Sequence, residues 1–71
     1  MPTEVESEIA GSVWKIETRV GAQVEAEDVL LILESMKMEI PVEAPCGGRV
    51  AEIRVAEGDD VQEGAILAVI D

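Results

Sequence analysis

The sequence predicts an all-β fold, and three observations support this. Val and Ile together number 17 residues against four Leu, and the chain has no Phe or Tyr. Residues branched at Cβ pack well on the pleated surface of a sheet, whereas helical bundles draw on Leu, Ala and Met at a 3.6-residue period. Apolar and polar residues also alternate in short segments, which glycines and prolines separate from one another. A β-sandwich or barrel follows.

The strands can be placed by the pattern in each segment. Alternation predicts three of them, at Val5–Ile9, within Ser12–Thr18 and within Arg49–Val55. Two continuous apolar runs, Val29–Leu33 and Ala65–Ile70, are typical of strands buried on both faces. Val24–Leu33 is the ambiguous segment, because its pattern also fits a short helix; we assign it as strand.

The length and charge of the chain exclude several classes of function. Seventy-one residues suffice for one domain, which we place at residues 1–71, and leave no room for two lobes or a deep cleft. Sixteen acidic residues against five basic ones give a net charge of -11, which repels nucleic acid and anionic membrane surfaces. We therefore expect neither as a partner.

The rarest residue types exclude further kinds of site. The chain has no His, and Cys46 is its single cysteine, so a His-based triad, a Cys/His zinc site and an intramolecular disulfide are all excluded. Residues 1–8 are acidic and polar, unlike a signal peptide, and no apolar run approaches the ~18 residues of a membrane-spanning helix. We expect a cytoplasmic protein that is monomeric in isolation and is not an enzyme.

The two halves of the chain resemble each other at an offset of 37 residues. Ala10–Val13 aligns with Gly47–Val50 without a gap, and the apolar pattern continues to match up to the last residue. Chance similarity in a chain rich in Val, Glu and Ala is the alternative explanation. Because a half of about 35 residues cannot sustain a core alone, we expect the halves to pack face to face around a pseudo-twofold axis. The connection Ser35–Ile40 and the two termini should then lie at opposite poles.

The connection carries an unusual hairpin sequence, Glu34–Glu39. Two-residue turns normally contain Asn-Gly or Asp-Gly because their residues need positive φ, but here the centre would be Met36-Lys37. Breaches of such local rules tend to occur at functional sites. Exposed methionines on either side of Lys37 would suit a surface that a partner contacts. Alternatively, Met36 and Met38 share one strand face and enter the core while Lys37 points outward.

Three segments resemble a known family. Glu34-Ser35-Met36-Lys37-Met38 is similar to the Glu-(Ala or Ser)-Met-Lys-Met motif of biotinyl domains, the biotin carboxyl carrier modules of biotin-dependent carboxylases. Pro45–Val50 is similar to the family's Pro-Met-x-Gly-x-Val stretch, and Gly58–Gly64 to its Gly-Asp-x-Val-x-x-Gly stretch. The resemblance covers the whole chain. It implies a flattened barrel-sandwich of two four-stranded halves related by a pseudo-twofold axis, with the lysine on the hairpin between them.

The resemblance also implies a function. Biotin would be the cofactor, attached covalently to Lys37 by a biotin protein ligase that first converts biotin to its adenylate. The ligase and partner subunits would recognise Glu34, Met36 and Met38. The loaded domain would shuttle a carboxyl group between the biotin carboxylase and carboxyltransferase sites of a carboxylase, which we expect to act on an acyl-CoA. The carrier itself would hold no catalytic residue and no metal.

The chain also departs from the family pattern. Glu8–Val13 stands where many members have a Pro-Met-Pro-Gly type of stretch. The halves align without a gap, which leaves no room for the extra loop, or thumb, in the carrier of typical bacterial acetyl-CoA carboxylase. We therefore expect the small free-standing type of biotinyl protein.

Other interpretations remain open. A lipoyl domain shares the fold, although its lysine is usually preceded by Asp and followed by Ala; an unmodified interaction module of the same fold is another alternative. Acidic pairs such as Asp59-Asp60 could serve as acid and base or bind Mg2+, but solvated loops are their ordinary role. Cys46 fits a small buried apolar residue or a reactive thiol. Trp14 on an outer face could contact a partner or cover a sheet edge.

Overall fold

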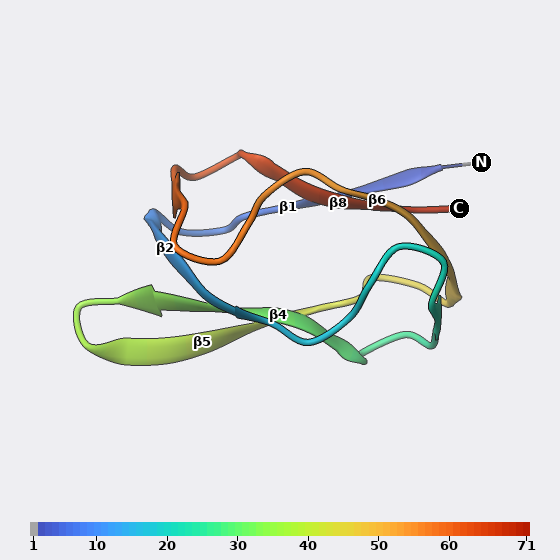
Figure 1. The fold of residues 1–71 in the computed structure, drawn as a ribbon, viewed down its shortest axis with the longest axis horizontal. Coiled ribbons are helices and arrows are strands. Elements are labelled where there is room, and N and C mark those ends of the chain that lie inside the picture. The colour runs from blue at the N-terminus through green and yellow to red at the C-terminus, as the bar shows by residue number, and fades with distance from the viewer. Residues whose placement is uncertain (1) are drawn as a thin grey trace.

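The computed structural model describes residues 2–71, so residue 1 of the expected domain lies outside the described part. The chain forms two four-stranded antiparallel sheets (Figure 1). In spatial order the first sheet contains β1 (Thr3–Glu6), β8 (Ile66–Ile70), β6 (Gly48–Ile53) and β3 (Gln23–Val24). The second contains β5 (Met38–Glu43), β4 (Val29–Ser35), β2 (Gly11–Ile16) and β7 (Asp60–Val61). The all-β prediction is confirmed.

Residues 2–71 include no helix with the length and hydrophobicity needed to cross a membrane. The segment that also fitted a helix, Val24–Leu33, instead contains the end of β3, a turn and most of β4. The Asp28 carboxylate accepts a hydrogen bond from the Glu25 backbone N–H at 2.9 Å in that turn. A side-chain cap of this kind favours a turn over a continuing helix.

The internal repeat is reproduced in the strand pairing. Each sheet takes two strands from each repeat, since β1 and β3 join β6 and β8 while β2 and β4 join β5 and β7. Thr3 pairs with Ile70 in one sheet and Ile40 pairs with Leu33 in the other, positions that differ by 37 residues in both cases. A bulge recurs at equivalent places in β6 and β2. The repeats are therefore related by the expected pseudo-twofold axis, but they interlock, with strands of both in each sheet, instead of packing face to face as expected.

The core lies between the two sheets and is aliphatic. Leu30 and its repeat equivalent Leu67 are both completely buried. β8 is buried from Leu67 to Ile70, in agreement with the continuous apolar run. The largest fully buried side chains come from both repeats: Leu30, Leu31, Leu33, Leu67, Ile70, Val13 and Val50. This shared core fixes the position of everything attached to the sheets.

Several strand boundaries differ from those predicted. The strand expected at Val5–Ile9 is β1, which ends at Glu6 opposite Ile66, the first residue of its partner β8. Alternation continues past that point, and the Ser7 backbone still forms hydrogen bonds with Ala65 and Gly64 at 2.8 Å. The register shifts between Val5 and Glu6, however, and the chain bends at residues 8 and 9, so the regular ladder ends there. Ser7 is instead buried in a turn, where its hydroxyl donates to the carbonyl of Ile9. The other expected strands shift by one or two residues at their ends.

The molecule is elongated, with extents of 32 × 17 × 17 Å. Figure 1 shows the β4–β5 hairpin at one end of the long axis and the beginning and end of the chain at the other. The predicted separation of the connection from the termini is thus confirmed. Whatever the hairpin carries projects away from the end where the chain enters and leaves.

Candidate functional site

The hairpin between β4 and β5 closes with a two-residue turn. The last paired residues are Ser35 and Met38, which leaves Met36 and Lys37 at the centre. Their φ angles are 52° and 65°, and a hairpin turn with positive φ at both central residues is of type I′. The left-handed conformation costs a residue with a Cβ roughly 1 kcal/mol or more. The predicted strained turn is therefore present at the predicted residues.

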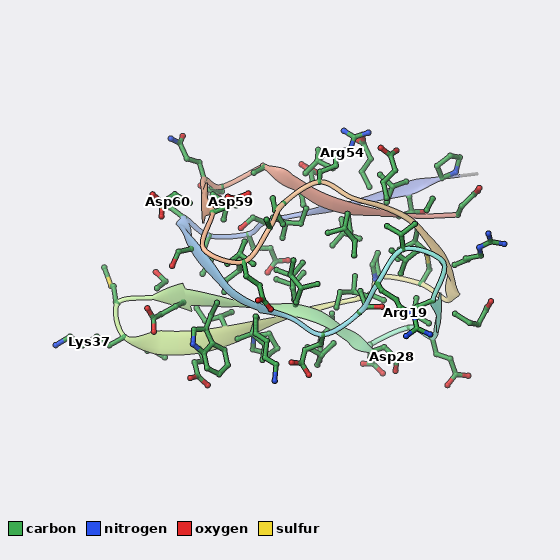
Figure 2. The ribbon with its side chains drawn as sticks, viewed as in Figure 1. Arg19, Asp28, Lys37, Arg54, Asp59 and Asp60 are labelled. Atoms are coloured by element: carbon green, nitrogen blue, oxygen red, sulfur yellow. The ribbon has the colours of Figure 1, made fainter. Side chains whose placement is uncertain are left out.

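The side chains of the tip point into solvent. Met36 is 94% exposed and Met38 is 63% exposed, so the alternative in which both methionines enter the core is wrong. Lys37 is exposed as well, and Figure 2 shows its side chain directed outward from the end of the hairpin, away from both sheets. The tip therefore presents an amine flanked by two thioether side chains.

The Lys37 ammonium has no counter-ion among residues 2–71. The ion pairs in this part of the chain join Lys15 to Glu17 at 3.4 Å and Arg54 to Glu52 at 3.5 Å. Glu34, expected to take part in recognition, is exposed and lies opposite a second glutamate, Glu39. The lysine is thus accessible to an external enzyme, and the carboxylates beside it are unpaired.

Gly11 supports the base of the hairpin, a role that the sequence interpretation did not assign. A Cβ at this position would lie 2.6 Å from the carbonyl oxygen of Glu34, so only glycine lets β2 approach β4 so closely. The equivalent Gly48 faces the carbonyl of Asp71, with a Cβ distance of 2.8 Å. The repeat alignment could have revealed this role, because glycine occupies both equivalent positions.

The remaining candidate residues have structural roles or lie elsewhere. Trp14 is 48% exposed, in agreement with an outer-face position, and Cys46 is half-buried and packs against the core. The Asp59 carboxylate accepts a hydrogen bond from the Ala56 N–H at 2.9 Å and so caps a turn. Within residues 2–71, no three His, Cys, Asp or Glu side chains gather closely enough to hold a metal ion. The hairpin is therefore the candidate site.

Comparison with known proteins identifies a family and two close sequence relatives. Residues 1–70 match the biotin/lipoyl family, described as "Biotin-requiring enzyme". The chain is 46% identical over 63 residues to the biotin/lipoyl attachment protein of Bacillus subtilis (strain 168), which covers 89% of this chain and 86% of that protein. It is also 46% identical over 70 residues to the biotinylated protein TB7.3 homolog of Mycobacterium leprae (strain TN), covering 99% of each.

A solved structure shows the same architecture. The urea carboxylase of Kluyveromyces lactis superposes with a TM-score of 0.95 at 39% sequence identity. The match covers 100% of this chain and 6% of that enzyme. In that enzyme, the same fold is thus one small domain of a much longer chain.

Proposed function

Because this chain belongs to the biotin/lipoyl attachment family, we propose that Lys37 is its biotin attachment residue. Biotin is the cofactor of the family, and a member of it is a carrier rather than a catalyst. One observation carries the assignment to Lys37: its amine stands alone at the tip of a type I′ turn between two exposed methionines. The other lysine, Lys15, lies within β2 and is paired with Glu17.

The hairpin fits a covalently attached biotin. A group that must reach separate sites needs an attachment point clear of the body, and Lys37 projects along the long axis beyond both sheets (Figure 2). No side chain among residues 2–71 is ion-paired with the amine and would have to be displaced. The unpaired ammonium can therefore be modified without disturbing the fold.

Attachment requires a biotin protein ligase with biotinyl adenylate as the acyl donor. The neutral Lys37 Nζ attacks the acyl carbonyl carbon, an amide C–N bond forms, the bond from that carbon to the phosphate oxygen breaks, and AMP leaves. The amine loses its proton to a base of the ligase, because no carboxylate among residues 2–71 is paired with Lys37. The modification removes one positive charge and changes the formal net charge from -11 by one unit.

The loaded carrier serves a biotin-dependent carboxylase. Biotin, once bound, supplies the ureido nitrogen that accepts a carboxyl group and passes it on. The chain contributes tethering: biotin held covalently on a projecting hairpin is present at a raised effective concentration at any enzyme site that binds the carrier. We expected an acyl-CoA acceptor, and this stays a prediction, since the related urea carboxylase indicates that the same carrier fold serves other acceptors.

Intact-mass measurement after expression with a biotin ligase tests the attachment site. Wild type and Lys15→Arg should each gain one biotin, whereas Lys37→Arg should gain none. Parallel expression with a lipoate ligase tests the lipoyl alternative, which the neighbours of Lys37 disfavour, because Met36 and Met38 stand where a lipoyl domain usually has Asp and Ala. Biotin found on Lys15, or lipoate accepted in preference to biotin, would show that the proposal is wrong.

A further inference from the structure

The two outer sheet faces are related by the pseudo-twofold axis but differ in chemistry. Trp14, the single aromatic residue of the chain, lies on the lysine-bearing sheet, where the other sheet has Ala51. Pro41 on β5 corresponds to Glu4 on β1. The body therefore provides its own comparison at these two positions, which hold large apolar residues on the lysine-bearing sheet and a small or a charged residue on the opposite sheet; Ile32 differs from them, since its equivalent Val69 is also apolar.

The apolar residues on the lysine-bearing face come from three neighbouring strands, with Lys15 beside them. Trp14 occupies the bulge of β2 between Val13 and Lys15, and Lys15 pairs with Ile32 of β4. Ile32 in turn pairs with Pro41 of β5. Side chains alternate along a strand, and the neighbours of Ile32 point into the core, so Ile32 and Pro41 face outward. Trp14, Ile32 and Pro41 form what we call the Trp14 patch.

The Trp14 patch is exposed to solvent, and its Trp side chain does not contribute to the core. Trp14 is 48% exposed and is not among the residues that pack on the core. Pro41 is exposed and Ile32 is half-buried. A half-exposed Trp beside other apolar groups is the type of residue that anchors protein interfaces, where Trp, Tyr and Arg dominate the binding energy.

A pair of like charges lies between this patch and the hairpin tip. Glu34 and Glu39 are directly opposite each other on β4 and β5, and they share the outer face with Ile32 because side chains two apart point the same way. Like charges directly across a sheet destabilise it. Neither carboxylate belongs to an ion pair within residues 2–71, so the charge is available to a cationic group of a partner.

Resting on the assignment of Lys37, we propose that the biotin ligase docks on this outer face, with an apolar recess over Trp14 and a cationic group opposite Glu39. The ligase must bring the acyl carbon into contact with Nζ at the end of a four-carbon stem. Ile32 is three residues from Ser35, or about 10 Å along the strand. An enzyme acting on the bare lysine must therefore cover the nearby strands, whereas a carboxylase can meet the longer biotinylated arm at a distance.

Steady-state kinetics of a purified biotin ligase, with the carrier as varied substrate, tests the role of Trp14. Trp14→Ala should raise KM for the carrier about tenfold and leave kcat unchanged, because the anchor is remote from the reacting amine. Trp14→Phe should recover part of the loss. Val20→Ala is the matched control, since Val20 is 59% exposed and lies by Arg49 and Asp71 at the opposite pole. A KM for Trp14→Ala within twofold of wild type would overturn the proposal.

Charge reversal separates docking from structure. Glu39→Lys places a cation opposite Glu34, so it should raise the thermal unfolding midpoint while it raises KM for the ligase severalfold. Glu4→Lys makes the same change of charge on the other sheet and should leave KM near the wild-type value. If the two substitutions raised KM equally, the effect would depend only on the overall charge of the carrier. The proposal that the ligase docks on this face would then be wrong.

Observation of Trp14 without mutation provides an independent readout. Since Trp14 is the single Trp, 5-fluorotryptophan labelling gives one 19F resonance, which should shift or broaden when unlabelled ligase is added. An unperturbed resonance, or a Trp14→Ala effect confined to the carboxylase step, would contradict ligase docking. Failure of wild type to accept biotin would instead overturn the assignment of Lys37, so the two failures are distinguishable.

Discussion

Positive φ angles occur both in the turns of the body and at the hairpin tip, but different residues adopt them. Gly21 and Gly58 occupy equivalent body turns with φ angles of 93° and 94°. At the tip the residues are Met36 and Lys37, at 52° and 65°. Glycine adopts this region freely, whereas a residue with a Cβ pays roughly 1 kcal/mol or more in strain.

This difference in residue type indicates that the body turns and the hairpin tip serve different purposes. Glycine in the body suits the backbone conformation, whereas the residues of the tip suit recognition by a partner. In the body, the pairing repeats register for register, and glycine recurs at Gly21 and Gly58. One body turn is an exception, since Glu27 has the positive φ that Gly64 has in the other repeat. The tip has no repeat equivalent within the described chain and retains an amine and two thioethers in place of the Asn-Gly that a type I′ turn favours. Such a local conflict, retained at an exposed turn, is typical of a functional site.

The largest effects should come from the two glycines that allow close strand contact. Gly11→Ala and Gly48→Ala would place a Cβ 2.6 Å and 2.8 Å from a backbone carbonyl oxygen. We expect each to lower the free energy of unfolding by about 2 kcal/mol, the usual range for forced overpacking. Urea denaturation monitored by circular dichroism measures both.

The two glycine variants should differ in function. The contact of Gly11 is with Glu34 at the base of the hairpin, whereas that of Gly48 is with Asp71 at the far pole. The rate of biotin attachment should therefore fall for Gly11→Ala and stay near wild type for Gly48→Ala under folded conditions. Equal attachment rates would mean that the hairpin base does not position Lys37.

A smaller effect, of opposite sign, is expected at the tip. Replacing Met36-Lys37 by Asn-Gly supplies the residues that a type I′ turn favours and should raise the free energy of unfolding by about 1 kcal/mol. The same variant cannot be biotinylated, because the amine is gone. Thermal unfolding and intact mass measure the two outcomes, and Met36→Asn alone serves as the control that keeps Lys37. A double variant no more stable than wild type would remove the argument that the tip is strained.

Features that follow from a repeated or local sequence pattern could be predicted. Features that depend on which residues become neighbours in space could not. The match of Gly21 to Gly58 and the turn at Met36-Lys37 were predictable, because both follow from spacing and local backbone rules. The end of β1 at Glu6 was not, since it follows a register shift against β8 that the alternating pattern does not reveal. The Trp14 patch also required the structure, because the alignment of Ile32 with Pro41 depends on strand register.

The smallest expected change in stability concerns a third pair of equivalent turns, in which the two repeats have different residues. Glu27 has a φ of 75° and its equivalent Gly64 has 88°, and their N–H groups donate to Ala44 and Ser7 at 2.8 Å in matching hydrogen bonds. Glu27→Gly removes the left-handed strain but adds freedom to the unfolded chain, so we expect a net gain of about 0.5 kcal/mol.

The reverse change completes this comparison. Gly64→Ala should cost about 1 kcal/mol, although no atom lies within 4 Å of the added Cβ, because the backbone conformation alone opposes it. Denaturant titration measures both variants, and biotin attachment should be unchanged in each, since neither residue belongs to the hairpin segment Glu34–Glu39. If Glu27→Gly lowered stability, positive φ at a non-glycine residue would not by itself mark strain in this fold, and the functional interpretation of Met36-Lys37 would rest on exposure alone.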